Sequence, residues 1–132
     1  MDKRLLKEKA VRVASAFFTE RGIRSVKMDD IAMELSISKR TLYELFSDKE
    51  ELLLEVVKSH REEMKAFMTK EAERAGNVLE IIMAFYRKIS QNFKNANNGF
   101  FDEIKKYPRV TDLLEKGRKD NIEGAMKFYA KG

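Results

Sequence analysis

The chain of 132 residues contains no cysteine and a single histidine, His60. Without cysteine it cannot form disulfides, zinc–thiolate sites, iron–sulfur clusters or a cysteine nucleophile, and one histidine excludes a histidine-rich metal site. We therefore expect no cofactor. No run of about 18 apolar residues could span a bilayer, and the N-terminus opens with charged residues instead of an apolar signal segment. These absences predict a cytoplasmic protein that is not associated with a membrane.

Proline and glycine are also scarce, with one and six residues, whereas 43% of the chain is hydrophobic and 37% is charged. Apolar residues recur at steps of three and four, the period of a helix with one buried face, and no strand-like alternation extends beyond a few residues. We predict an all-α fold. The expected helices cover approximately residues 3–21, 28–35, 39–46, 48–74, 77–93 and 100–107, with a seventh around residues 113–128.

We place a domain boundary near residue 47, which divides the chain into regions 1–47 and 48–132. Ser47 with Glu50 matches a capping box, a pattern that would open the fourth helix at this boundary. The net charge of +5 permits a polyanionic partner without requiring one, although residues 1–27 hold eight basic and only three acidic side chains.

The second and third predicted helices are too short to be stable alone, so they must pack against the first helix and each other. Ala32 is small enough for a close helix crossing, and Ile37 is an apolar residue in the short connection, an arrangement typical of a helix-turn-helix. Ser38 is a good N-cap for the third helix. That helix would expose Lys39, Arg40, Thr41, Tyr43 and Glu44, which suits recognition of a DNA major groove.

Three runs in this region occur in a characteristic order, and Ala14, Phe17, Phe18, Glu20, Arg21 and Gly22 extend the pattern backward. The runs are Met28-Asp29-Asp30-Ile31-Ala32, Ser36-Ile37-Ser38-Lys39-Arg40-Thr41-Leu42-Tyr43 and Phe46-Ser47-Asp48-Lys49-Glu50-Glu51-Leu52. Together they resemble the TetR-type (tetracycline repressor) family of bacterial transcriptional regulators, over roughly residues 5–57. The resemblance implies a homodimer that places the third helix of each subunit in the major groove of operator DNA. It also implies that the later helices form a ligand-binding and dimerisation domain.

The same resemblance assigns candidate DNA contacts. Lys39 and Arg40 would read bases, while the backbone would be contacted by Ser38, Thr41, Tyr43, Lys49 and Lys27. The ring of Tyr43 could instead cover the core. Two features depart from the family pattern: Lys27 stands where a capping Thr or Ser is usual, and Ser36 and Arg40 stand where glycine is frequent.

Aromatic and methionine side chains are abundant in the second region. The simpler interpretation is an ordinary helix-bundle core; the resemblance favours a pocket for a small apolar effector between the fourth, fifth and seventh helices. Its candidate lining residues are Met64, Phe67, Met68, Phe85, Tyr86 and Phe101. A lone histidine on an apolar helix face, such as His60, is more often a packed, hydrogen-bonded residue than a functional one.

The favoured hypothesis is a ligand-responsive transcriptional regulator, most often a repressor in this family, and not an enzyme. The alternative is a helical protein-interaction module that binds no DNA. Family members are commonly longer than 132 residues, so we expect the C-terminal part of the regulatory domain, with the usual dimerisation helices, to be missing from this sequence.

Overall fold

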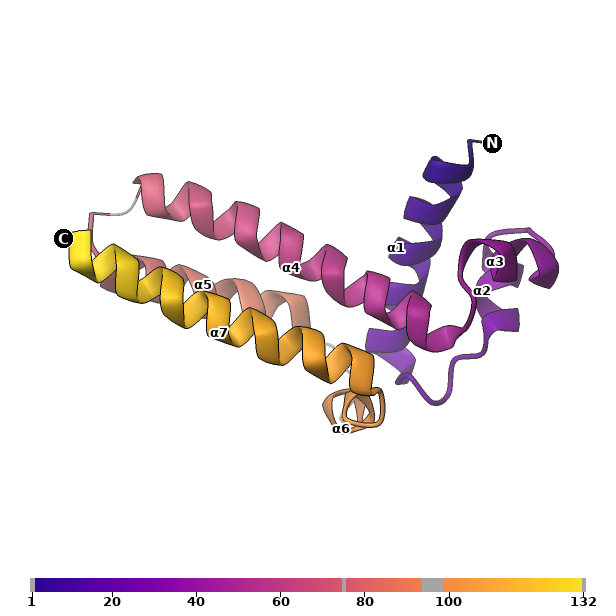
Figure 1. Ribbon diagram of the computed structural model, residues 1–132. Coiled ribbons are helices and arrows are strands. Elements are labelled where there is room, and N and C mark those ends of the chain that lie inside the picture. Colours follow the sequence, from indigo (N-terminus) through magenta and orange to yellow (C-terminus); the bar gives the residue numbers. More distant parts are fainter. Residues whose placement is uncertain (1, 75, 94–98, 132) are drawn as a thin grey trace.

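The computed structural model describes residues 2–74, 76–93 and 99–131, without the side chains of residues 92, 93, 101 and 120–131. Within these ranges the protein consists of seven α-helices and no strand (Figure 1). The all-α prediction is therefore confirmed. The helices are α1 (Lys3–Arg21), α2 (Met28–Glu34), α3 (Lys39–Leu45), α4 (Lys49–Arg74), α5 (Val78–Phe93), α6 (Phe100–Ile104) and α7 (Pro108–Lys131).

Helix α1 has the predicted bounds because both of its ends carry local signals. Asp2 caps the first turn by accepting a hydrogen bond from the Arg4 N–H at 3.2 Å. At the other end Gly22 adopts a φ of 86°, and its N–H donates to the Phe18 carbonyl at 3.0 Å. A positive φ of this kind favours glycine, which lets the chain leave the helix without strain.

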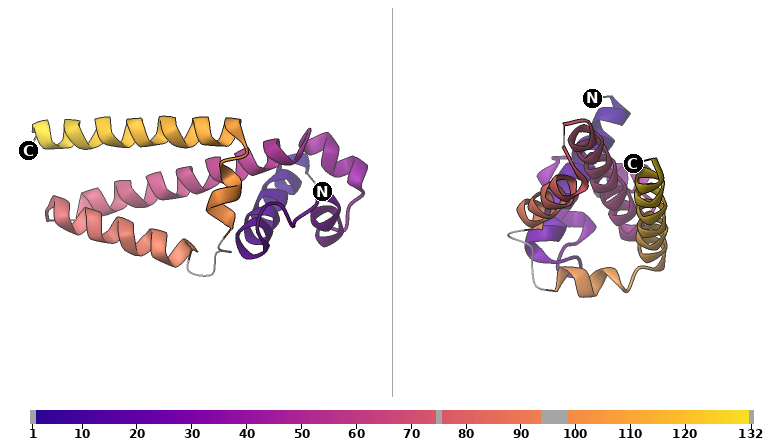
Figure 2. Two further views of the ribbon diagram at one scale, coloured as in Figure 1. Left: turned by 90° about the horizontal axis from the view of Figure 1, so that it is seen from below. Right: turned by 90° about the vertical axis from the view of Figure 1, so that its left-hand side faces the viewer.

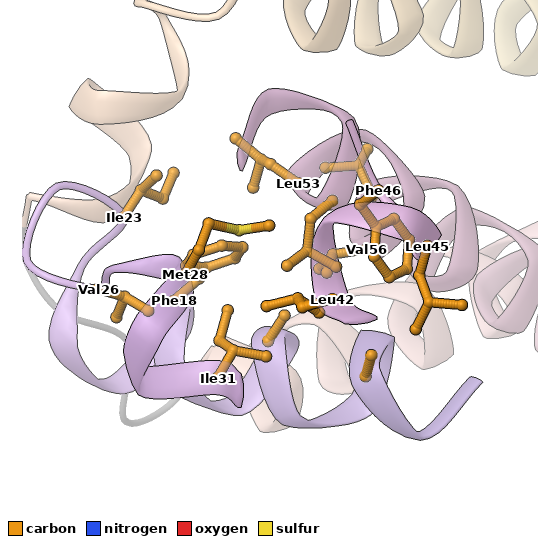
Figure 3. Packing of buried hydrophobic residues seen from close by; sticks show 14 of the residues in the cluster. Phe18, Ile23, Val26, Met28, Ile31, Leu42, Leu45, Phe46, Leu53 and Val56 are labelled. Atoms are coloured by element: carbon orange, nitrogen blue, oxygen red, sulfur yellow. The ribbon is translucent and has the colours of Figure 1, made fainter. Parts of the chain in front are cut away.

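The core lies where α1, α2, α3 and the first turns of α4 meet. Phe18, Ile31, Leu42, Phe46 and Leu53 converge there, each with no exposed surface (Figure 3). Residues from all four helices share this cluster. Because α2 and α3 have seven residues each, this packing is what stabilises them.

Helix α4 belongs to both ends of the molecule. Its buried residues, Leu52, Leu53, Val56 and Val57, all lie in its first turns and pack in the N-terminal core. Farther along, α4 contacts both α5 and α7, and the three helices form a triangle in the right-hand view of Figure 2. The start of α4 also corrects a prediction: Asp48, not Ser47, caps it by accepting from the Glu51 N–H at 2.7 Å.

The cap is displaced by one residue because the helix begins at Lys49. Glu51 therefore occupies the third helical position that we assigned to Glu50, and its carboxylate accepts hydrogen bonds from the N–H and the hydroxyl of Ser47. The predicted boundary at residue 47 falls in this connection, and the hydrophobic cluster is continuous across it.

Helix α6 and the start of α7 join the C-terminal helices to the N-terminal core. Phe100, Ile104 and Val110 are buried in the same cluster as Val57. The carboxylate of Glu103 accepts a hydrogen bond from the backbone N–H of Arg24 at 2.9 Å, and Arg109 pairs with Glu50 at 3.6 Å. Through the Glu103–Arg24 hydrogen bond, α6 links the C-terminal helices to the connection between α1 and α2.

Helix α6 ends at Ile104, before the predicted residue 107, and α7 already begins at Pro108 because proline suits a first helical position. The predicted loop over residues 94–98 and the side chains of Ile122, Met126 and Phe128 lie outside the described residues. In the part of the chain that the structure describes, none of the helices combines the length and apolar character needed to cross a membrane.

Candidate nucleic-acid interface

Helix α3 is held in place from one side only. Ser38 caps it, as predicted: its hydroxyl oxygen accepts from the Thr41 N–H at 3.0 Å and lies 2.9 Å from the Thr41 hydroxyl. Leu42 and Leu45 are buried. Since these residues point into the core, the opposite face of α3 is left at the surface, at the end of the molecule away from α5 and α7 (Figure 1).

The connection between α2 and α3 is a tight turn. The Ser36 N–H donates to the Met33 carbonyl at 3.1 Å, and the Ile37 N–H donates to the Ala32 carbonyl at 3.0 Å. Ser36 has a φ of 56°, in the left-handed region. That conformation explains why glycine suits this position in the family that the sequence resembles, and it costs a residue with a side chain about 1–2 kcal/mol.

Four charged or aromatic side chains form the outward face of α3, namely Lys39, Arg40, Tyr43 and Glu44. The side chain of Arg40 is 90% exposed and that of Lys39 is 60% exposed. Tyr43 is 43% exposed, so its ring is not sealed in the core. The two cations and the Tyr43 ring are therefore open to solvent.

The region that contains α2 and α3 also matches a known protein family. Residues 10–56 match the model of a family described as bacterial regulatory proteins, tetR family. They run from the middle of α1 to the buried turns of α4 and include the whole turn between α2 and α3. This region belongs to the tetR family.

Two relatives come from Bacillus subtilis (strain 168). The uncharacterized HTH-type transcriptional regulator YvaF is 35% identical over 108 residues, which cover 81% of this chain and 54% of the relative. The uncharacterized HTH-type transcriptional regulator YezE is 29% identical over 87 residues, which cover 66% of this chain and 43% of the relative. The chain thus spans about half the length of these relatives. No solved structure is a significant match.

Each outward cation of α3 has a carboxylate partner. Lys39 Nζ lies 3.0 Å from Asp29 Oδ1 of α2, and Arg40 Nε lies 3.6 Å from Glu44 Oε1 one turn along α3. The hydrogen bond and charge of Asp29 raise the pKa of Lys39. Neither acid is among the residues that the sequence predicts for the DNA contact. The spacing of Arg40 and Glu44 is visible in the sequence, whereas the approach of Asp29 depends on how α2 and α3 cross.

The two cations proposed for phosphate outside α3 lie in different surroundings. Lys27 is exposed at the start of α2, and its backbone N–H donates to Asp30 Oδ2 at 2.8 Å. This bond is the reciprocal half of a capping box, and the Asp30 N–H donates to the Lys27 carbonyl at 3.0 Å. Lys49 is half-buried, and this burial lowers its pKa against the opposing influence of Glu103 and Asp30. Its contact with phosphate stays a prediction.

The candidate effector residues also remain a prediction. Met64, Phe67, Met68 and Phe85 are half-buried on α4 and α5, and the Lys88 ammonium lies 5.4 Å from the centre of the Phe67 ring. Tyr86 is largely exposed, and the side chain of Phe101 lies outside the described residues. None of these residues lines a groove of about 350 Å³ between α1 and the end of α2 or a hollow of about 110 Å³ between α1 and α4.

His60 lines that smaller hollow. Its Nε2 lies 2.7 Å from the Ser15 hydroxyl, which links α4 to α1. This placement fits the interpretation of His60 as a packed, hydrogen-bonded residue.

Proposed function

We propose that this protein is a ligand-responsive transcriptional regulator, a repressor in its simplest form, that binds double-stranded operator DNA. The exposed face of α3 carries the proposal, since a capped helix with a buried inner face presents Lys39 and Arg40 to solvent within a tetR-family region. These two residues would contact base edges, while Ser38, Thr41, Tyr43, Lys27 and Lys49 would contact the backbone. This role requires no catalysis.

Operator binding would involve a homodimer. Two copies of α3 would enter major grooves about one helical turn, or about 10 base pairs, apart. The family resemblance supports this assembly.

The effector would act through α4, because that helix contributes both to the N-terminal core and to the region of Met64, Phe67 and Met68. A small apolar ligand that binds there could change the separation of the two recognition helices. It would shift the equilibrium only by its difference in affinity for the two arrangements. We propose that binding of the effector releases the operator.

The direct test is the double variant Lys39→Ala/Arg40→Ala. A duplex selected from a random pool by the unaltered protein is titrated by fluorescence anisotropy at several salt concentrations. We expect the variant to lose base selectivity and affinity, and to show a shallower salt dependence if either cation also lies near phosphate. The matched control is Arg118→Ala/Lys119→Ala, which removes the same charge from exposed positions on α7.

Unchanged affinity and selectivity in the α3 variant would contradict the assignment of Lys39 and Arg40. If the unaltered protein itself shows a flat salt dependence with every duplex, the interaction-module alternative is favoured, because neutralisation of phosphates makes DNA affinity fall steeply with salt.

A further inference from the structure

Together with Asp29 of α2, the outward face of α3 carries two positive and two negative charges and no net charge. Lys39 pairs with Asp29 and Arg40 pairs with Glu44, and all four side chains are more than half exposed. Ion pairs as exposed as these contribute little to the stability of a fold. A groove-facing surface that served only to attract phosphate would gain nothing from two carboxylates beside its cations.

The pair within α3 leaves the end of the Arg40 guanidinium available. Glu44 Oε1 lies 3.6 Å from Nε of Arg40, an ion-pair contact on the side of the guanidinium closest to the backbone. Both terminal nitrogens can then donate to one acceptor pair, since a guanidinium has five N–H donors in a fixed planar arrangement. Guanine presents such a pair, O6 and N7, in the major groove.

Glu44 also makes a competing use of Arg40 less favourable. A flexible arginine can contact phosphate as well as a base, and phosphate contacts carry no sequence information. The carboxylate of Glu44 repels a phosphate that approaches Arg40, because both groups are negative. The ion pair with Glu44 also favours conformations in which the Arg40 side chain runs along α3, because residues at i and i+4 share a face of a helix.

We propose that Glu44 is a positioning residue that directs Arg40 to a guanine at one position of each operator half-site, and so determines specificity there. The inference rests on the proposed function and names the base that α3 selects. Lys39 differs, because its ammonium is a compact point charge with three rotatable donors instead of a planar guanidinium, and because its partner Asp29 belongs to α2.

The experiment compares the unaltered protein with Arg40→Ala, Glu44→Gln and Asp29→Asn. Asp29→Asn is the matched control: it removes the same charge from the same surface but from the partner of Lys39. The duplex selected by the unaltered protein is altered to each other base at every position, and dissociation constants are measured for all of them. Circular dichroism checks that each variant is folded, which is expected because the three substituted side chains are exposed.

We expect the unaltered protein to prefer guanine at one position by roughly 5- to 150-fold. Arg40→Ala should abolish that preference and leave the other positions as they are. Glu44→Gln should reduce the same preference by roughly three- to fivefold, the upper end of what an exposed ion pair contributes, and should strengthen binding to unrelated duplexes. Asp29→Asn should leave this guanine preference within about twofold of its original value.

Three results would overturn the inference. Full guanine preference in Glu44→Gln would show that Arg40 reads the base unaided, and an equal loss in Asp29→Asn would show a general effect of charge. Survival of the guanine preference at that position in Arg40→Ala would remove the inference while the proposed function stands. If the unaltered protein has no sequence preference in any duplex, the proposed function fails as well.

Discussion

The two ends of this molecule differ in how completely they bury their apolar side chains. Around α1, α2, α3 and the first turns of α4, large residues such as Phe18 and Phe46 have no exposed surface. Along α5, in contrast, a stripe of large apolar residues is exposed, namely Leu79, Ile82, Met83 and Tyr86. The tightly packed end is the one that presents α3.

The difference indicates where the described part of the chain obtains its rigidity. Helix α3 has only seven residues and is not stable alone, so its conformation depends on the packing beneath it. The α4–α5–α7 region meets the core through α4, and Phe100, Ile104 and Val110 join it there from α6 and α7. Loss of packing should therefore be most damaging at the N-terminal end.

The largest expected effect tests this comparison directly. Phe46→Ala should lower the free energy of unfolding by about 3–5 kcal/mol, because it leaves a cavity beneath α3. Phe67→Ala, at a half-buried position on α4, should lower it by about 1 kcal/mol. Urea denaturation followed by circular dichroism measures both. Equal losses in the two variants would show that the N-terminal end is not the better packed.

A smaller effect of opposite sign is expected in the turn beneath α3. Ser36→Gly should raise the free energy of unfolding by about 0.5–1 kcal/mol, since glycine adopts the observed φ of 56° without steric conflict. Ser36→Ala is the control and should bring no such gain, because it keeps the Cβ. A loss of stability in Ser36→Gly, measured by the same denaturation, would mean that the turn is not strained.

The smallest expected effect concerns pH. Hydrogen bonds from Ser47 lower the pKa of Glu51 below its ordinary value of 4.5. The folded state therefore favours the carboxylate, whose stabilising contribution is complete above pH 4.5 and is lost as the pH falls through the lowered pKa. The contribution is small because the group is close to solvent.

Thermal unfolding of Glu51→Gln from pH 7 to pH 3 measures this contribution. The variant should melt at a lower temperature than the unaltered protein at pH 7, and the difference should shrink below pH 4.5. Ser47→Ala should show a reduced version of the same pH dependence, because the backbone N–H of Ser47 still donates to Glu51. A difference that stays constant over the whole range would contradict the assignment.

Much of the fold can be predicted because its signals are local. The bounds of α1 and the cap of α3 depend on residues within one turn, Asp2, Gly22 and Ser38, and these predictions are confirmed. The Ser47 and Glu50 prediction is wrong by one residue, because two adjacent pairs satisfy the same spacing and the packing of α4 selects Asp48 and Glu51. Local patterns identify a helix better than they locate its first residue.

The candidate site divides in the same way. Spacing and family resemblance point to Lys39 and Arg40, and the structure leaves both accessible. The partnership of Lys39 with Asp29 cannot be predicted, because it depends on the crossing of α2 and α3. The half-buried position of Lys49 beside Glu103 likewise depends on α6, more than fifty residues away.

Periodicity and capping residues are enough to define helices and to identify the helix-turn-helix, because hydrogen bonds within a helix join residues only a few positions apart. The packing of the helices decides that Asp29 of α2 meets Lys39 of α3, and it decides which apolar face stays exposed. Those outcomes depend on distances between elements that are remote in the chain, and packing alone sets such distances.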